Sequence, residues 1–348
     1  MPHDIFGTRI VAAPMAGGTS TPAFVKAVHD AAGLGFLAAG YKTVAGMEAE
    51  IRTARAAGAR FGMNVFVPDA AQAAPSGAVR AELEEYRARL RPDALRYGVE
   101  VPPLRLDDDD DWNGKVASLV ADPVELVSFT FGLPGGDTVR ALQRAGSTVL
   151  ATVTTVAEAL EAAGQGMDAL VVQHPCAGGH SAAFQPGALR DKIEHDDSLP
   201  GTTAELVAQV RAAVDLPLLA AGGVMDRAGL AEVLAAGARA AQLGTVFLRT
   251  DESGARQVHK DALGSPRFTE TRLTRAFTGR PARALVNEFV RDHPDAPEAY
   301  PAVHHLTAPL RAAAAAAGDA ERLNLWAGTG WQQARTGSVA EVVAALVG

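Results

Sequence analysis

The chain has few of the residues that cross-link small secreted domains or place a protein in a membrane. Cys176 is the only cysteine among 348 residues, which excludes intrachain disulfides and cysteine-rich metal sites. No stretch is apolar over the length of a membrane span, and the N-terminus lacks the basic and apolar regions of a secretory signal. We therefore expect a cytoplasmic protein without a membrane partner.

The chain also has no excess of positive charge. The 32 Lys and Arg residues face 40 Asp and Glu residues, which gives a formal net charge of -8. No basic run is dense enough to follow a nucleic-acid backbone, so we expect no nucleic-acid partner. The nine histidines show no ligand-like spacing, and we expect no dedicated metal site.

The chain does contain a regular alternation of short β-branched runs with Ala-rich segments of helical period. This alternation predicts β–α units around a parallel sheet. A last amphipathic helix is expected at 338–347, after a long insertion. The expected strands are 9–15, 35–40, 61–67, 126–132, 148–154, 169–174, 217–223 and 241–247, and the helices between them are 22–32, 44–57, 76–96, 137–145, 156–163, 203–213 and 227–236.

The order of these elements favours a (β/α)8 TIM barrel over a doubly wound sheet. A doubly wound sheet carries its glycine fingerprint after the first strand, where this chain reads Ala-Pro-Met-Ala-Gly-Gly. We expect residues 1–249 and 324–348 to form the barrel, and residues 250–323 to form a helical cap inserted after strand eight. The acidic run 107–111 is expected to be a solvated loop.

Two glycine-containing turns predict an anion site. Gly222 and Gly223 end the seventh strand, and Gly244 and Thr245 end the eighth. Glycine lets backbone amides approach an anion closely, and a helix that starts beyond Thr245 would add the positive end of its dipole. One pair alone could merely turn the chain, but two pairs at these strand ends indicate a phosphate cradle.

Two other expected strands supply polar residues at the same end of the barrel, since Asn64 interrupts the apolar run of 61–66 and Gln173 ends that of 170–173. Asn64 and Gln173 each offer a hydrogen-bond donor and an acceptor, which suits the edge of a flavin, although either could instead satisfy the backbone. In the loop after Gln173, Gly178 and Gly179 would let the chain fold over a ligand and direct His180 toward it. An imidazole there could act as a general base or bind an anionic substrate.

Several short motifs in order complete the pattern. They are Ala-Ala-Pro-Met-Ala-Gly at 12–17, Phe-Gly-Met-Asn at 61–64, Ser-Phe-Thr-Phe-Gly-Leu-Pro at 128–134, Ala-Gly-Gly-His at 177–180, Ala-Ala-Gly-Gly at 220–223, Gly-Thr at 244–245 and Thr-Arg-Ala-Phe-Thr-Gly-Arg-Pro-Ala-Arg at 274–283. With these motifs the chain resembles the nitronate monooxygenases over nearly its whole length. The resemblance implies an FMN-dependent barrel enzyme that oxidises alkyl nitronates, and by extension nitroalkanes, with dioxygen to a carbonyl compound and nitrite.

The resemblance also implies roles for single residues, a small anionic substrate and FMN as the cofactor. His180 matches the family's catalytic histidine. The cofactor-binding residues implied are Ala13, Pro14 and Met15 against the flavin ring, Asn64 and Gln173 as its hydrogen-bond partners, Gly178 and Gly179 beside it, and Gly222, Gly223, Gly244 and Thr245 around the phosphate.

The chain departs from the family pattern beside the histidine, where His174, Cys176 and Ser181 replace a glycine, a glutamate and an arginine. We expect this change in local charge to affect the identity of the substrate more than the binding of the flavin. Other activities stay open: an FMN-dependent NAD(P)H reductase of enoyl-thioesters or quinones, or a biosynthetic flavoenzyme for an unusual nitrogen-containing metabolite. A flavin carrier without turnover and a flavin-free barrel also stay open. The sequence does not decide between His180 as base and as anion-binding group, or whether the chain forms a homodimer.

Overall fold

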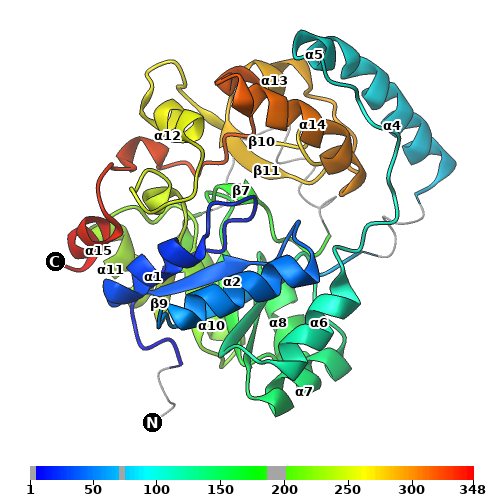
Figure 1. The fold of residues 1–348 in the computed structure, drawn as a ribbon. Helices are drawn as coiled ribbons and strands as arrows, with labels where there is room; N and C mark the ends of the chain where they lie inside the picture. Colours follow the sequence, from blue (N-terminus) through cyan, green and yellow to red (C-terminus); the bar gives the residue numbers. More distant parts are fainter. Residues whose placement is uncertain (1–4, 70–74, 186–200) are drawn as a thin grey trace.

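The centre of the molecule is a closed barrel of parallel strands (Figure 1). The computed structural model describes residues 5–69, 75–185 and 201–348, and within them eight strands pair in the order β1-β2-β3-β4-β5-β6-β8-β9, with β1 against β9. The expected TIM barrel is therefore confirmed. The strands are β1 Ile10–Ala12, β2 Leu34–Ala38, β3 Phe61–Phe66, β4 Leu126–Thr130, β5 Thr148–Val153, β6 Ala169–Gln173, β8 Leu218–Ala221 and β9 Ala240–Leu243.

Helices surround the barrel, and local capping explains where several of them begin. Thr202 and Ser338 each form a capping box, with Glu205 and Glu341, at the starts of α10 and α15. The last helix, α15, returns from the cap to pack against α1 and α11, as expected for a displaced eighth helix. The barrel helices are α1 Pro22–Asp30, α2 Val44–Ala56, α6 Trp112–Ala121, α7 Gly136–Ala145, α8 Val156–Gly164, α10 Thr203–Ala213, α11 Arg227–Ala235 and α15 Val339–Val347.

The strands stop earlier than expected at their carboxyl ends. Gly222 and Gly223 have φ angles of +106° and +71°, which take the backbone out of the extended region directly after β8. The eighth strand was expected to reach 247, but β9 ends at Leu243 and Thr245–Phe247 form a short 3₁₀ helix, η2. Gly222, Gly223, Gly244 and Thr245 therefore lie just beyond the strands, whereas Asn64 and Gln173 are within β3 and β6.

The segment expected as one helix at 76–96 is two helices, α4 Gly77–Arg89 and α5 Arg91–Arg96. Pro92 lies at the start of α5, where its missing N–H cannot continue the hydrogen bonds of α4. Neither helix covers the barrel between β3 and β4, since α6 does so. Their apolar residues, such as Leu83 and Ala94, share a core cluster with Phe289 and Leu306 of the cap. Figure 1 shows α4 and α5 above the barrel, next to α13 Glu288–Asp292 and α14 Ala302–Ala316.

The inserted segment contains a small sheet as well as the expected helices. Strands β10 Thr271–Thr274 and β11 Ala282–Leu285 pair antiparallel, and β11 also pairs with β7 Gly179–His180 from the loop after β6. The cap thus holds the histidine loop of the barrel as its third strand. The helices of the insertion are α12 Gln257–Gly264, α13 Glu288–Asp292 and α14 Ala302–Ala316.

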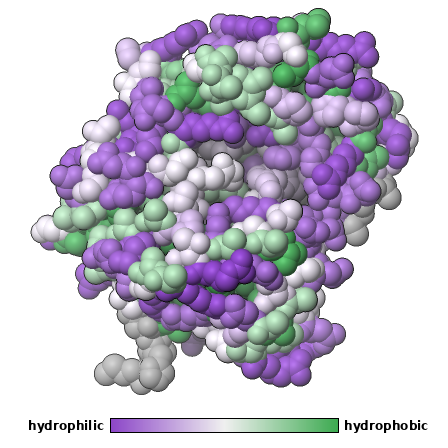
Figure 2. All heavy atoms as spheres, in the orientation of Figure 1, coloured by the Kyte–Doolittle hydropathy of each residue, from purple (hydrophilic) through white to green (hydrophobic). Residues whose placement is uncertain are grey.

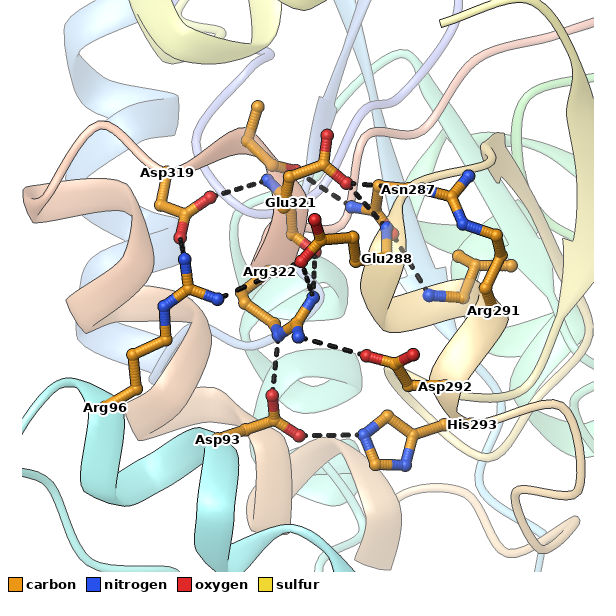
Figure 3. Close-up of polar contacts among 12 residues, drawn as sticks. Asp93, Arg96, Asn287, Glu288, Arg291, Asp292, His293, Asp319, Glu321 and Arg322 are labelled. Carbon is orange, nitrogen blue, oxygen red and sulfur yellow. Dashed lines mark hydrogen bonds and ion pairs between the residues drawn. The ribbon is translucent and has the colours of Figure 1, made fainter.

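A network of ion pairs centred on Arg322 joins α5 to the rest of the cap (Figure 3). Its guanidinium contacts Asp93 at 2.6 Å, Asp292 at 3.0 Å and Glu288 at 3.1 Å. Asp93 also accepts a hydrogen bond from His293 Nε2 at 2.9 Å. Burial alone would raise the pKa of Asp93, but the hydrogen bonds from His293 and Arg322 lower it below its ordinary value. Asp93 is therefore a charged group of the folded cap at neutral pH.

Replacing Arg322 by methionine is expected to destabilise the cap strongly. Arg322 and Asp93 are only 7% and 9% exposed, so the variant would leave a buried carboxylate without its cation, at a cost of about 3 kcal/mol or more. The measurement is urea unfolding followed by circular dichroism. Arg96→Met is the control, because the Arg96 side chain is 49% exposed and its pair with Asp319 at 3.2 Å contributes less than about 1 kcal/mol. Equal losses in the two variants would contradict this assignment.

Candidate active site

A cavity of about 400 Å³ lies between the carboxyl ends of the barrel strands and the underside of the cap. Figure 2 shows the surface hollowed between these two parts. Every residue that the sequence analysis assigned to the site lines this cavity. These residues are Ala13, Pro14, Met15, Asn64, Gln173, Gly178, Gly179, His180, Gly222, Gly223, Gly244 and Thr245.

His180 is held in the cavity wall by both the barrel loop and the cap. Its backbone pairs with Ala282 of β11, and its Nε2 lies 2.9 Å from Thr278 Oγ1. The rings of Phe131 and Trp326 contact the imidazole at centroid distances of 5.6 and 5.3 Å. The side chain is therefore fixed in position before any substrate binds.

Burial keeps the imidazole of His180 neutral. Desolvation is the main cause that lowers its pKa to about 3, and the positive charges of Arg280 and Arg311 lower it further. The hydroxyl of Thr278 donates to the carbonyl oxygen of Arg280 at 3.3 Å, which is compatible with a proton on His180 Nε2 and a lone pair on Nδ1. At neutral pH this ring can accept a proton or form a hydrogen bond, but it carries no positive charge with which to attract an anion.

The two amides expected to contact a flavin are partly used by the protein. Gln173 donates to the His180 carbonyl oxygen at 3.1 Å and accepts from the Ala182 amide at 2.8 Å, so it braces the histidine loop. Asn64 Nδ2 donates to Ser128 Oγ and Thr130 Oγ1, both at 2.9 Å. Since its NH₂ group is used in this way, Asn64 has only its oxygen left to offer a ligand.

The cavity lining at Gln242, Gly244 and Thr245 has hydrogen-bonding capacity for a further group. A Cβ placed on Gly244 would make only ordinary contacts, at 3.7 Å, with Ala13 Cβ and Met15 Sδ, so neighbouring protein atoms do not crowd this position. Gln242 Oε1 is buried and has no hydrogen-bond partner among the described residues. Thr245 Oγ1 accepts from the Gly328 amide at 2.9 Å. The unpaired oxygen of Gln242 and the uncrowded backbone at Gly244 fit a bound flavin, whose ring would supply a donor and whose phosphate could approach the glycine.

The structure adds cavity residues that sequence reasoning did not single out. Phe131 has a φ angle of +81°, a strained value for a residue with a side chain. Its ring packs against Phe66 at 4.5 Å, and the guanidinium of Arg280 lies 4.0 Å from its centroid. The motif at 128–134 was a signal for Phe131, since its Phe-Gly pair follows a strand. The contacts of Arg280 and Phe66 arise only when distant segments meet.

The acidic run also supports the cavity wall, and its expectation as a solvated loop was wrong for two of its members. Asp108 lies 2.7 Å from His305, and Asp110 lies 2.8 Å from Lys115, whose side chain is fully buried. Asp110 also accepts from the backbone amide of Tyr41 at 2.9 Å. Burial raises the pKa of Asp110 to about 6, despite the opposing effect of Lys115. A buried lysine needs a counter-charge, which explains why this part of the run is folded inward.

The chain is similar to proteins of a known family over nearly its whole length. The family model described as nitronate monooxygenase matches residues 3–348. The chain belongs to the nitronate monooxygenase family. A probable nitronate monooxygenase of Staphylococcus aureus strain MSSA476 is 33% identical over 344 residues, which cover 97% of this chain and 93% of the relative.

Two solved structures are similar to the chain. The structure of nitroalkane oxidase from Streptomyces ansochromogenes is 50% identical, superposes with a TM-score of 0.91, and covers 99% of this chain and 95% of its own. FabK from Thermotoga maritima is 22% identical with a TM-score of 0.72, covers 98% of this chain and 92% of its own, and shows likeness of fold alone.

Family membership makes the chain a flavin-dependent oxidoreductase that acts on nitronates or nitroalkanes. Among the described helices, none has the length and apolar character needed to cross a membrane. Within residues 5–69, 75–185 and 201–348, no group of three or more His, Cys, Asp or Glu side chains converges in a way that could hold a metal ion.

Proposed function

We propose that the chain binds FMN and oxidises a small nitronate with dioxygen, giving a carbonyl compound and nitrite. The observation that carries the proposal is the position of His180. A buried neutral imidazole faces the same cavity as the glycine turns after β8 and β9, where barrels place a phosphate. Membership of the family supports the reaction class.

FMN fits the residues that line the barrel side of the cavity. Asn64 Oδ1 and Gln242 Oε1 are acceptors that the N–H of a flavin ring could satisfy. Glycines without side chains would let the phosphate approach the backbone closely. When bound, the flavin supplies the electron acceptor that the protein side chains lack. The residues proposed to hold it are Ala13, Pro14, Met15, Asn64, Gln173, Gly178, Gly179, Gly222, Gly223, Gly244 and Thr245.

His180 is proposed to act on the substrate through its neutral ring. With a neutral nitroalkane, the lone pair on Nδ1 would accept the α-proton, while Thr278 keeps Nε2 oriented. With a preformed nitronate no base is required, and the ring would only position the anion by hydrogen bonding. Barrel residues 1–249 and 324–348 would supply the flavin site. The insertion 250–323, together with α4 and α5, would form the cap that excludes water from it.

The test is an aerobic assay with nitroethane and with freshly prepared ethyl nitronate. We expect the FMN-loaded protein to consume oxygen with the nitronate and to release nitrite and acetaldehyde in equal amounts. The FMN-free apoprotein is the control for uncatalysed decay of the nitronate. If neither compound gave nitrite while NADH or NADPH was oxidised, the protein would be a reductase and the proposal would be wrong.

A further inference from the structure

The cap contains two buried arginines, three positions apart, that the proposed reaction does not use. Arg280 lies directly before β11 and Arg283 lies within it, and both belong to the motif at 274–283. They are only 4% and 1% exposed. An arginine is seldom buried to this extent, because its guanidinium loses the hydration of its charge. Each of these groups therefore depends on hydrogen bonds within the protein.

Arg280 binds the chain just beyond His180. Its Nε donates to the carbonyl oxygen of Ser181 at 3.1 Å, and its Nη2 donates to the carbonyl oxygen of Ala183. The guanidinium also lies 4.0 Å from the centroid of the Phe131 ring. Desolvation lowers the pKa of Arg280 to about 10, so the group is charged at neutral pH. Within the described residues, two carbonyl oxygens and one aromatic ring hold this cation, rather than a carboxylate.

Arg283 reaches the other end of the same loop. Its Nε donates to the carbonyl oxygen of Pro175 at 2.8 Å, and its Nη1 donates to Thr271 Oγ1 of β10 at 3.3 Å. The histidine loop, residues 174–183, is thus bound near both of its ends by guanidinium groups of one cap segment. Hydrogen bonds from a charged donor are stronger than those from a neutral one, and a buried carbonyl that loses its donor is costly.

Between the two arginines, the backbone of the cap runs alongside His180. The amide of Ser181 donates to the carbonyl oxygen of Pro281 at 2.8 Å, and His180 pairs with Ala282 in the ladder of β7 and β11. Strand β7 has only two residues, and so short a pairing is weak by itself. The guanidinium contacts on either side of it keep the pairing closed and in register.

We propose that Arg280 and Arg283 are positioning residues for His180, and that their guanidinium groups clamp the histidine loop to the cap so that the imidazole stays directed into the cavity. Neither arginine lines that cavity, so each acts on the reaction through the loop. The inference rests on the proposed role of His180 and adds the residues that hold it in place.

The test measures amide hydrogen exchange, by mass spectrometry, in the FMN-loaded protein. We expect exchange in peptides that cover residues 174–183 to become about tenfold faster or more in Arg280→Met and in Arg283→Met, because each variant leaves loop carbonyls without their charged donor. Peptides from β2 and β3 should exchange as in the wild type. Unchanged exchange of the loop in both variants, or an equal increase throughout the barrel, would overturn the clamp.

Arg275→Met is the matched control. Arg275 belongs to the same motif and its side chain is 10% exposed, but it pairs with Glu298 at 3.6 Å and not with the loop. Exchange of the loop should stay at the wild-type rate in this variant, and an increase equal to that in Arg280→Met would refute the clamp.

Arg280→Lys keeps the charge but not the planar fork that reaches two carbonyl oxygens. Its loop should exchange at a rate between those of the wild type and Arg280→Met. This variant also decides the question if the methionine variants do not fold. Faster exchange confined to the loop would then support the clamp, and exchange at the wild-type rate would refute it.

A kinetic readout separates the positioning of His180 from a general effect on the cap. In the proposed reaction nitroethane needs a base, whereas ethyl nitronate does not. At equal FMN content, flavin reduction in Arg280→Met should slow about tenfold or more with nitroethane and less than about threefold with ethyl nitronate. Equal losses with the two compounds would refute the positioning role. If neither compound reduced the wild-type flavin, the proposed function would fail, while exchange of the loop would still decide whether the clamp exists.

Discussion

Replacement of His180 by asparagine is expected to slow flavin reduction by nitroethane about a hundredfold or more while FMN stays bound. A positioned acid–base group contributes typically a hundredfold to ten-thousandfold to a rate, and asparagine lacks the basic ring nitrogen. Asparagine is neutral, as His180 is at pH 7, so the cavity keeps its charge. The measurement is anaerobic stopped-flow absorbance of the flavin after mixing with nitroethane, with flavin content determined beforehand.

His174→Asn is the matched control for this variant. His174 belongs to the same loop but does not line the cavity between the barrel and the cap, where the flavin and substrate are proposed to bind. Its Nδ1 accepts from the Cys176 amide at 3.3 Å, a contact that an asparagine oxygen could imitate. We expect flavin reduction in His174→Asn to stay within about threefold of the wild type. Unchanged reduction in His180→Asn, or equal losses in the two variants, would show that His180 is not catalytic.

The pH dependence gives a second readout of His180. Its folded-state pKa of about 3 lies below the ordinary value of about 6.5, so the ring stays neutral as the pH falls from 8 to 5. Flavin reduction by a preformed nitronate, added just before mixing, should therefore show no step near pH 6.5 that depends on His180. A step that disappears in His180→Asn would mean that the ring is protonated in this range and acts by its charge.

Introducing an aspartate at Gly244 is expected to weaken FMN binding about thirtyfold without unfolding the barrel. Gly244 has a negative φ of −113°, and an added Cβ would make only ordinary contacts with Ala13 and Met15, so the fold tolerates a side chain there. Two unit charges 4 Å apart repel by about 4 kcal/mol at an effective dielectric constant near 20, and half of that weakens binding about thirtyfold. The measurement is the Kd for FMN of the apoprotein, determined by flavin fluorescence.

Gly244→Asn separates charge from size, because asparagine has nearly the same shape as aspartate. The aspartate variant should bind FMN at least about tenfold more weakly than the asparagine variant, and the difference should shrink with added salt. Riboflavin, which lacks the phosphate, should not distinguish the two variants. An equal loss of FMN and riboflavin in both variants would place the phosphate away from Gly244.

The barrel and one side of its site could be predicted because both depend on local patterns. Strands and helices alternate along the chain, and residues after parallel strands meet at the same end of the barrel. Asn64 in β3, Gln173 at the end of β6 and Gly244 after β9 therefore reach one cavity, and this could be expected without any knowledge of side-chain packing. The strand ends were predicted too long, because the turn at Gly222 and Gly223 leaves the sheet through positive φ angles.

The cap side of the site could not be predicted because it is made by contacts between distant segments. His180 and Thr278 are in contact although they are 98 residues apart in the sequence, and no sequence pattern predicts this contact. Helix α4 has an apolar face that would fit the barrel as well as the cap, and only packing places Leu83 beside Phe289. Arg311 directly precedes the Ala tract 312–317. A lone arginine in such a helical pattern would be expected on a solvated face, whereas in the fold Arg311 lines the cavity.

The most direct test of the central claim is anaerobic mixing of the FMN-loaded protein with ethyl nitronate in one cell and with NADH or NADPH in another. Flavin absorbance is followed in both. We expect the nitronate to bleach the flavin completely, at a rate at least equal to steady-state turnover, and the nicotinamides to leave it oxidised. Rapid reduction by NADH or NADPH, with the nitronate inert, would contradict the proposed oxidation and identify a reductase.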